Sequence, residues 1–93
     1  MATEFLTNHA KVLLCVAQDP DARLRDIAAS VELTERAAHR LLSELVEEGY
    51  VVRERRGRRN AYRVKVNRPL PDPVAQKRKV GELLEVLVGR NGR

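Results

Sequence analysis

The residues of this 93-residue chain with the clearest chemical potential form one run of like charge. Between residues 51 and 68, eight basic side chains stand against one acidic side chain, Glu54, which gives this segment a net charge of +7. The basic residues are Arg53, Arg55, Arg56, Arg58, Arg59, Arg63, Lys65 and Arg68. The whole chain carries only +5, because residues 1–50 sum to −4 and residues 69–93 to +2. Such a concentration of positive charge is typical of a surface that binds a polyanion, most often a nucleic acid.

Residues suited to catalysis or metal binding are sparse by comparison. His9 and Cys15 are six positions apart and do not share a helical face, and no further cysteine or histidine cluster completes a metal site. The sequence contains no Ser-His-Asp order, phosphate-binding glycine loop or cofactor fingerprint. We therefore predict a binding protein without enzymatic activity, cofactor or metal, and we expect Cys15 in the core.

The composition is that of a small folded protein of the cytoplasm. Apolar residues make up 43% of the chain, which is enough for one core at this length. The single cysteine excludes an internal disulfide framework and fits a reducing compartment. No apolar run approaches the ~18–20 residues that a membrane-spanning helix needs. Residues 1–9 lack the features of a signal peptide, so we expect no membrane partner.

Apolar periodicity predicts three helices in the first half of the chain. They are expected at about 8–18, with Thr7 or Asn8 as the cap, at about 25–30, and from the cap Thr34 to about Glu48. Gly49 then ends the third helix in a left-handed conformation. The positions expected to be buried are Leu6, Ala10, Leu13 and Ala17 (with Val12 and Val16 beside them), Ile27 and Ala28, and Ala38, Leu41, Leu42 and Leu45.

The chain then predicts a β-hairpin. Strands are expected at about 50–55 and 61–66, and Gly57 marks the loop that joins them. A short strand near Arg23 and Leu24 is expected to pair with the hairpin.

Beyond the hairpin, three prolines within residues 69–73 predict a semi-rigid extended linker. A last helix is expected at about 74–89. Its apolar stripe consists of Val80, Leu83, Leu84, Leu87 and Val88. We expect this stripe to be a homodimer interface, and packing against the first helix of the same chain is the alternative.

The order of three helices, a hairpin and a last helix predicts an α+β, mainly α fold, the winged helix-turn-helix. The segment LTERAAHRLLSELVEEGYVVR, residues 33–53, resembles the recognition-helix segment of MarR-like winged-helix transcriptional regulators. RDIAASV, residues 25–31, resembles the preceding helix of that motif, and the similarity covers about residues 8–66. The resemblance implies a transcriptional regulator of bacterial or archaeal type. Its third helix enters the major groove of double-stranded DNA, and its hairpin, the wing, follows the backbone.

On the pattern of that family, DNA-facing residues lie on the exposed face of the third helix, and the concentration of arginine adds residues of the wing. On the helix they are Thr34, Arg36, Ala37, His39, Arg40 and Ser43, with Glu35 beside them; in the wing they are Arg55, Arg56, Arg58, Arg59, Asn60 and Arg63. Arg36 and Arg40 lie one turn apart, and either can donate a bidentate pair to guanine. The wing arginines suit phosphates or a narrow minor groove. The alternatives are solvent-facing side chains without a partner, a purely capping Thr34 and Asn60 as a turn residue.

Two other functions stay open on the sequence alone. A winged helix can serve as a protein-interaction module, with a partner on the acidic flank formed by Glu44, Glu47 and Glu48, although such a module needs no arginine run. Binding of RNA, or of DNA without sequence preference, is compatible with the same charges. We predict sequence-directed binding of duplex DNA by a homodimer, with residues 1–68 as the DNA-binding domain and residues 69–93 as linker and dimerisation helix.

Overall fold

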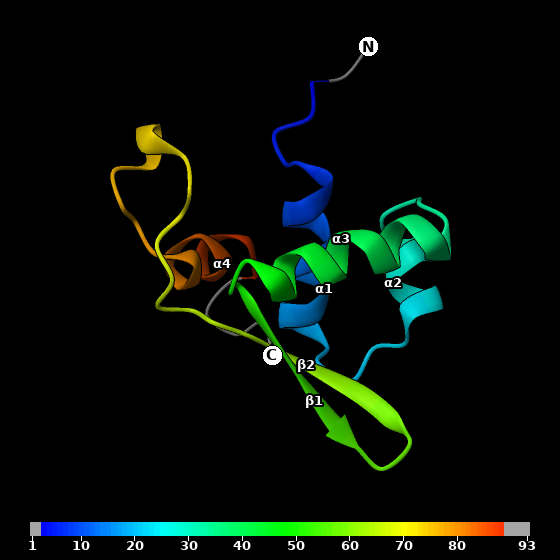
Figure 1. The fold of residues 1–93 in the computed structure, drawn as a ribbon. Coiled ribbons are helices and arrows are strands. Elements are labelled where there is room, and N and C mark those ends of the chain that lie inside the picture. Colours follow the sequence, from blue (N-terminus) through cyan, green and yellow to red (C-terminus); the bar gives the residue numbers. More distant parts are fainter. Residues whose placement is uncertain (1–2, 89–93) are drawn as a thin grey trace.

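A computed structural model describes residues 3–88, and its elements follow the order of a winged helix (Figure 1). They are α1 (Asn8–Gln18), α2 (Leu24–Ser30), α3 (Glu35–Glu47), β1 (Val51–Arg56), β2 (Arg59–Val64), the 3₁₀ turn η1 (Pro73–Ala75) and α4 (Val80–Val88). The β1–β2 hairpin projects from a body of helices. The expected α+β, mainly α fold is confirmed. Within residues 3–88, no helix is long and apolar enough to cross a membrane.

Local chemistry sets the ends of α1 and α3. The Thr7 hydroxyl accepts a hydrogen bond from the backbone N–H of Ala10 at 3.1 Å, and the Thr34 hydroxyl accepts one from Ala37 at 3.0 Å. Each hydroxyl satisfies one of the N–H groups that the first turn of a helix leaves free. At the other end of α3, Gly49 has a φ of +88°, a conformation that costs glycine little. The boundaries expected from the sequence are confirmed here.

The core lies where α1, α2 and α3 meet the base of the hairpin and α4. Helix α3 contributes its predicted buried face, which consists of Ala38, Leu41, Leu42 and Leu45. The face expected for α1 is wrong in part, since Val12 and Val16 are at most 1% exposed whereas Leu6, Ala10 and Ala17 are only half-buried. Helix α1 is apolar around most of its circumference, so periodicity alone does not single out the side that packs.

The hairpin is tighter than expected. Strands β1 and β2 pair antiparallel from Val51 opposite Val64 to Arg56 opposite Arg59, which leaves Gly57 and Arg58 as a two-residue loop. Two-residue loops match the twist of paired strands, and Gly57 has the positive φ, +62°, that such a loop needs. Arg59 and the expected turn residue Asn60 are therefore strand residues.

The expected strand near Arg23 and Leu24 is wrong. Arg23 is the N-cap of α2 and Leu24 is its first residue. The hairpin is instead attached to the turn between α1 and α2 by one hydrogen bond, in which the Tyr62 N–H donates to the Pro20 carbonyl at 3.1 Å. The turn is thus held without a third strand among the described residues.

The expected extended linker is also wrong, because residues 69–79 fold back on themselves. Pro69 forms an isolated antiparallel bridge with Lys79. Pro69 has no N–H to donate. The next residue, Leu70, has one, and it donates to the Arg78 carbonyl at 2.8 Å. Gln76 and Lys77 have φ of 55° and 64°, so a helix cannot run through them. Helix α4 accordingly begins at Val80 and not at residue 74; its expected end at residue 89 lies outside the described residues.

Helix α4 packs against α1 of the same chain. Val80 is 1% exposed and Leu84 is 7% exposed, and both belong to the main core. These two side chains therefore cannot form the dimer interface expected of them. Leu83 and Val88 are half-buried, and Leu87 is the exposed member of the predicted stripe. The neighbouring Val86, outside that stripe, is the most exposed apolar residue of α4 at 80%.

Candidate nucleic-acid interface

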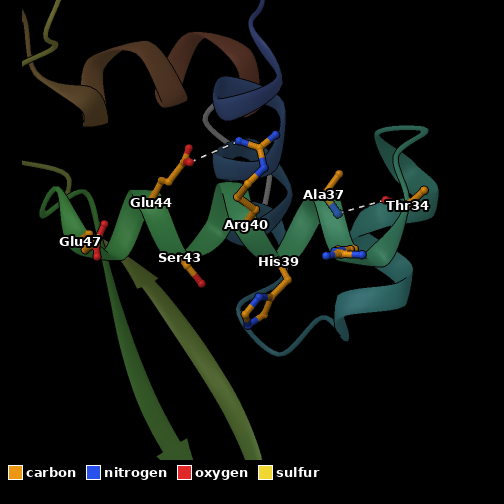
Figure 2. A pocket seen from close by; sticks show the side chains of 8 residues that line it. Thr34, Ala37, His39, Arg40, Ser43, Glu44 and Glu47 are labelled. Carbon is orange, nitrogen blue, oxygen red and sulfur yellow. Dashed lines mark hydrogen bonds and ion pairs between the residues drawn. The ribbon is translucent and has the colours of Figure 1, made fainter.

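The outer face of α3 brings together the helix residues expected to face DNA. They line one shallow hollow together with two glutamates (Figure 2), and the full lining is Thr34, Arg36, Ala37, His39, Arg40, Ser43, Glu44 and Glu47. This face lies opposite the buried residues of α3, because a helix repeats every 3.6 residues. His39 and Ser43 point to the side from which the hairpin extends.

Arg40 forms an ion pair with the carboxylate of Glu44, and the sequence analysis did not predict this pair. Its Nη1 lies 3.3 Å from Glu44 Oε2, and Figure 2 shows the guanidinium turned toward Glu44 and away from His39. The other carboxylate oxygen of Glu44 lies 2.7 Å from Nε2 of His9 on α1. The hydrogen bond with His9, helped by the charge of Arg40, lowers the pKa of Glu44 below its ordinary value. At neutral pH Glu44 is therefore ionised and partly neutralises Arg40.

Arg36 differs from Arg40 in this respect. Within residues 3–88, neither Arg36 nor His39 forms an ion pair or a side-chain hydrogen bond. Arg36 is exposed on the first turn of α3, one turn before Arg40. The two arginines thus share a helix face, but Arg36 carries the unopposed positive charge.

The hairpin arginines that share a face with Glu54 are neutralised in part. Paired residues of an antiparallel ribbon project on the same side, so Glu54 and Arg56 share their face with Arg59 and Arg63. Nη1 of Arg56 lies 3.4 Å from the Asp21 carboxylate, and Nε of Arg63 lies 3.3 Å from Glu54. Arg59 donates to the backbone carbonyl of Asp21. The contacts of Arg56 and Arg59 with Asp21 fasten the wing to the turn between α1 and α2, whereas the Arg63–Glu54 pair joins the two strands of the wing.

The opposite face of the hairpin is less engaged with acidic groups. It carries Arg53 and Arg55, whose cross-strand neighbours are Tyr62 and Asn60. Nε of Arg55 donates to the carbonyl of Gly57 at 3.1 Å, which braces the loop. In the described part of the chain, Arg53 and the loop residue Arg58 have no acidic partner. Arg53 thus shares a hairpin face with the expected wing residue Arg55, although the site predicted from the sequence did not include it.

Three side-chain pairs at the candidate interface were not predicted from the sequence, namely Arg40–Glu44, His9–Glu44 and Asp21–Arg56. Arg40 and Glu44 are four apart in a helix, a spacing at which side chains meet, so that pair was open to prediction. His9 and Glu44 are 35 positions apart, as are Asp21 and Arg56. No local pattern connects residues at such separations.

Residues 3–88 contain neither an activated thiol nor a cluster of metal-binding side chains. The thiol of Cys15 is half-buried on α1, and burial raises its pKa, which disfavours the nucleophilic thiolate. No three side chains of His, Cys, Asp or Glu come together there in an arrangement that could hold a metal ion.

The family model described as the IclR helix-turn-helix domain matches residues 6–55, from the start of α1 to β1. A search of curated proteins finds no match. The winged helix-turn-helix expectation is confirmed, but the family is IclR and not the MarR-like one. The matched range contains the whole segment 33–53, on which the MarR-like resemblance rested, so that resemblance was assigned to the wrong family.

Proposed function

This chain belongs to the IclR helix-turn-helix family, and from that premise we propose that it regulates transcription by sequence-directed binding of double-stranded DNA. In this proposal α3 lies in the major groove and the hairpin follows the neighbouring backbone. The proposed contacts on α3 come from Thr34, Arg36, Ala37, His39, Arg40 and Ser43. In the wing they come from Arg53, Arg55, Arg56, Arg58, Arg59, Asn60 and Arg63.

One observation supports this proposal most strongly. The exposed face of α3 is backed by four buried side chains of the same helix, so its outward residues are held rigidly. A rigid helix face fits the major groove, which presents a distinct pattern of donors and acceptors for each base pair. The hairpin beside it supplies the positive charge that phosphates require.

Selection of bound duplexes from a random pool at ~150 mM salt, near physiological ionic strength, tests the proposal. We expect a sequence motif to be enriched, and binding to weaken as salt rises. Replacing Arg58 and Arg59 together by Ala should make the log–log salt slope shallower by ~1–2, because each phosphate contact contributes about 0.9. A protein that binds no duplex at low salt, or binds every duplex equally, contradicts the proposal.

The proposal includes a homodimer that places two copies of α3 on half-sites about one DNA turn apart, ~34 Å. Support comes from the apolar side chains that α4 leaves in solvent, Val86 at 80% and Leu87 at 37% exposure. Replacing both by Glu should give a monomer in sedimentation experiments. Val74→Glu is the matched control, because Val74 is 89% exposed on η1. A parent protein that is monomeric at tens of micromolar, roughly the protein concentration of such measurements, contradicts the dimer.

A further inference from the structure

A second hollow of the molecule lies on the other side of Glu44 from the α3 face. It is a groove of about 370 Å³ bordered by α1, the end of α3, residues 70–72 and the start of α4. Its apolar lining consists of Leu13, Leu45, Tyr50, Leu70, Val80 and Leu83. This volume lies within the ~300–1,000 Å³ range of small-molecule sites, which are mostly apolar with a few placed polar groups.

The side chains with ionisable acid or base groups that line the groove are acidic, apart from His9 and the phenol of Tyr50. Glu44, Glu48 and Asp72 line it, and among the described residues no lysine or arginine does. Arg68 lies nearby, 5.1 Å from the centroid of the Tyr50 ring, where it donates to the Glu48 carbonyl at 3.0 Å. An apolar groove lined in part by acidic residues complements a ligand with an apolar body and a positive charge. This is unusual in a chain of net charge +5.

Glu44 connects this groove to the proposed DNA face. It lines both hollows, with one oxygen 3.3 Å from Arg40 Nη1 and the other 2.7 Å from His9 Nε2. Both oxygens of this carboxylate are therefore engaged within the chain, and any cation that pairs with Glu44 from the groove must compete with Arg40 for it.

We propose that this groove binds a small organic cation, an alkylammonium group on an apolar body, and that its occupancy strengthens DNA binding by releasing Arg40 from Glu44. The effect on DNA rests on the proposed function, whereas ligand binding does not. By linkage, DNA must strengthen binding of the cation by the same factor.

Binding is tested without DNA, by titrating isotope-labelled protein with hexylamine, which is protonated at pH 7, and following backbone amide resonances. We expect saturable shifts at Leu13, Leu45 and Leu83 with a Kd of about 1–10 mM, the range for so few ligand atoms. Hexanol has the same apolar chain without the charge, and should bind at least about fivefold more weakly because it cannot pair with the carboxylates. Glu48→Gln and Asp72→Asn should each weaken hexylamine about two- to fivefold. Glu85→Gln, the same charge change on α4 outside the groove, should leave its Kd unchanged.

Equal affinity for hexanol, the absence of saturation, or groove shifts that follow protein concentration without ligand would each overturn the site. The last result would mean that a second copy of the chain occupies the groove.

The coupling is measured on the selected duplex, with methylamine at equal ionic strength as the reference. Saturating hexylamine should tighten DNA binding about two- to fivefold, the scale of one exposed ion pair, and Glu44→Gln should abolish this effect. Groove binding with unchanged DNA affinity would overturn the coupling. Groove binding by a protein that binds no duplex would contradict the proposed function and leave the cation site standing.

Discussion

The outer face of α3 and the hairpin differ in how many arginines they carry and in the element that supports them. On α3 two arginines stand on a helix whose other side is buried, and one of them is already paired within the chain. The hairpin carries far more arginine on a two-stranded ribbon, and holds it in place through Glu54 and Asp21. A few rigid donors suit discrimination between bases, whereas many charges on a ribbon suit affinity for any backbone. We therefore expect α3 to supply most of the specificity for DNA sequence and the wing to supply most of the affinity.

The largest expected effect is on stability, and it compares the packing beneath α3 with the packing of the wing. Leu42→Ala removes a side chain that is 1% exposed beneath α3, and should lower the free energy of unfolding by about 2–5 kcal/mol. Val52→Ala, at a half-buried position of β1, should cost about 1 kcal/mol or less, because it leaves a smaller cavity open to solvent. Urea denaturation of both variants measures the difference. Equal losses would mean that the wing is as firmly packed as α3.

The next effect concerns base discrimination on α3. Arg36→Ala should weaken binding to the preferred duplex by about 1–3 kcal/mol and flatten the preference at one base pair. Arg40→Ala should cost less, because Arg40 must first leave Glu44. Binding-site selection and titration of each variant provide the measurement. A larger loss for Arg40 than for Arg36 would contradict this ranking and would show that the pairing with Glu44 does not weaken the contact of Arg40 with DNA.

Substitution of a wing arginine should weaken DNA binding less than Arg36→Ala does, and by a similar factor for every duplex sequence. Arg58→Ala should weaken every duplex about fivefold at ~150 mM salt and reduce the salt slope by about 0.9, the contribution of one phosphate contact. Lys77→Ala, a basic residue of the 69–79 loop outside the wing, is the matched control and should change neither quantity. Loss of the selected motif in the Arg58 variant would assign base reading to the wing.

The smallest expected effect is a gain in affinity for DNA and not a loss. Glu44→Gln removes the negative charge beside Arg40, and should tighten binding to all duplexes about two- to fivefold, the scale of an exposed ion pair. Glu47→Gln is the control, since Glu47 lines the same face without a described contact to Arg40. Fluorescence anisotropy at fixed salt detects the change. Equal effects of the two substitutions would indicate long-range charge alone.

Much of the framework was open to prediction because its signals are local. Thr34 caps α3, Gly49 ends it, and its four buried positions repeat at helical spacing. The residues expected to face DNA on α3 lie on one surface for the same reason. The wrong predictions concern segments whose local sequence is compatible with more than one structure. Three closely spaced prolines fit an extended linker as well as the observed folded loop, and the apolar circumference of α1 did not reveal which side packs.

The sequence by itself determined the helices, the hairpin, the position of its arginines and the outward face of α3, because each depends on residues a few positions apart. Only the tertiary structure decided which of those charges are free. His9 reaches Glu44, and Asp21 reaches Arg56, across 35 positions each, and α4 buries Val80 and Leu84 against α1. Such contacts depend on how whole elements pack against each other. Packing is a property of the assembled core, and no single segment encodes it.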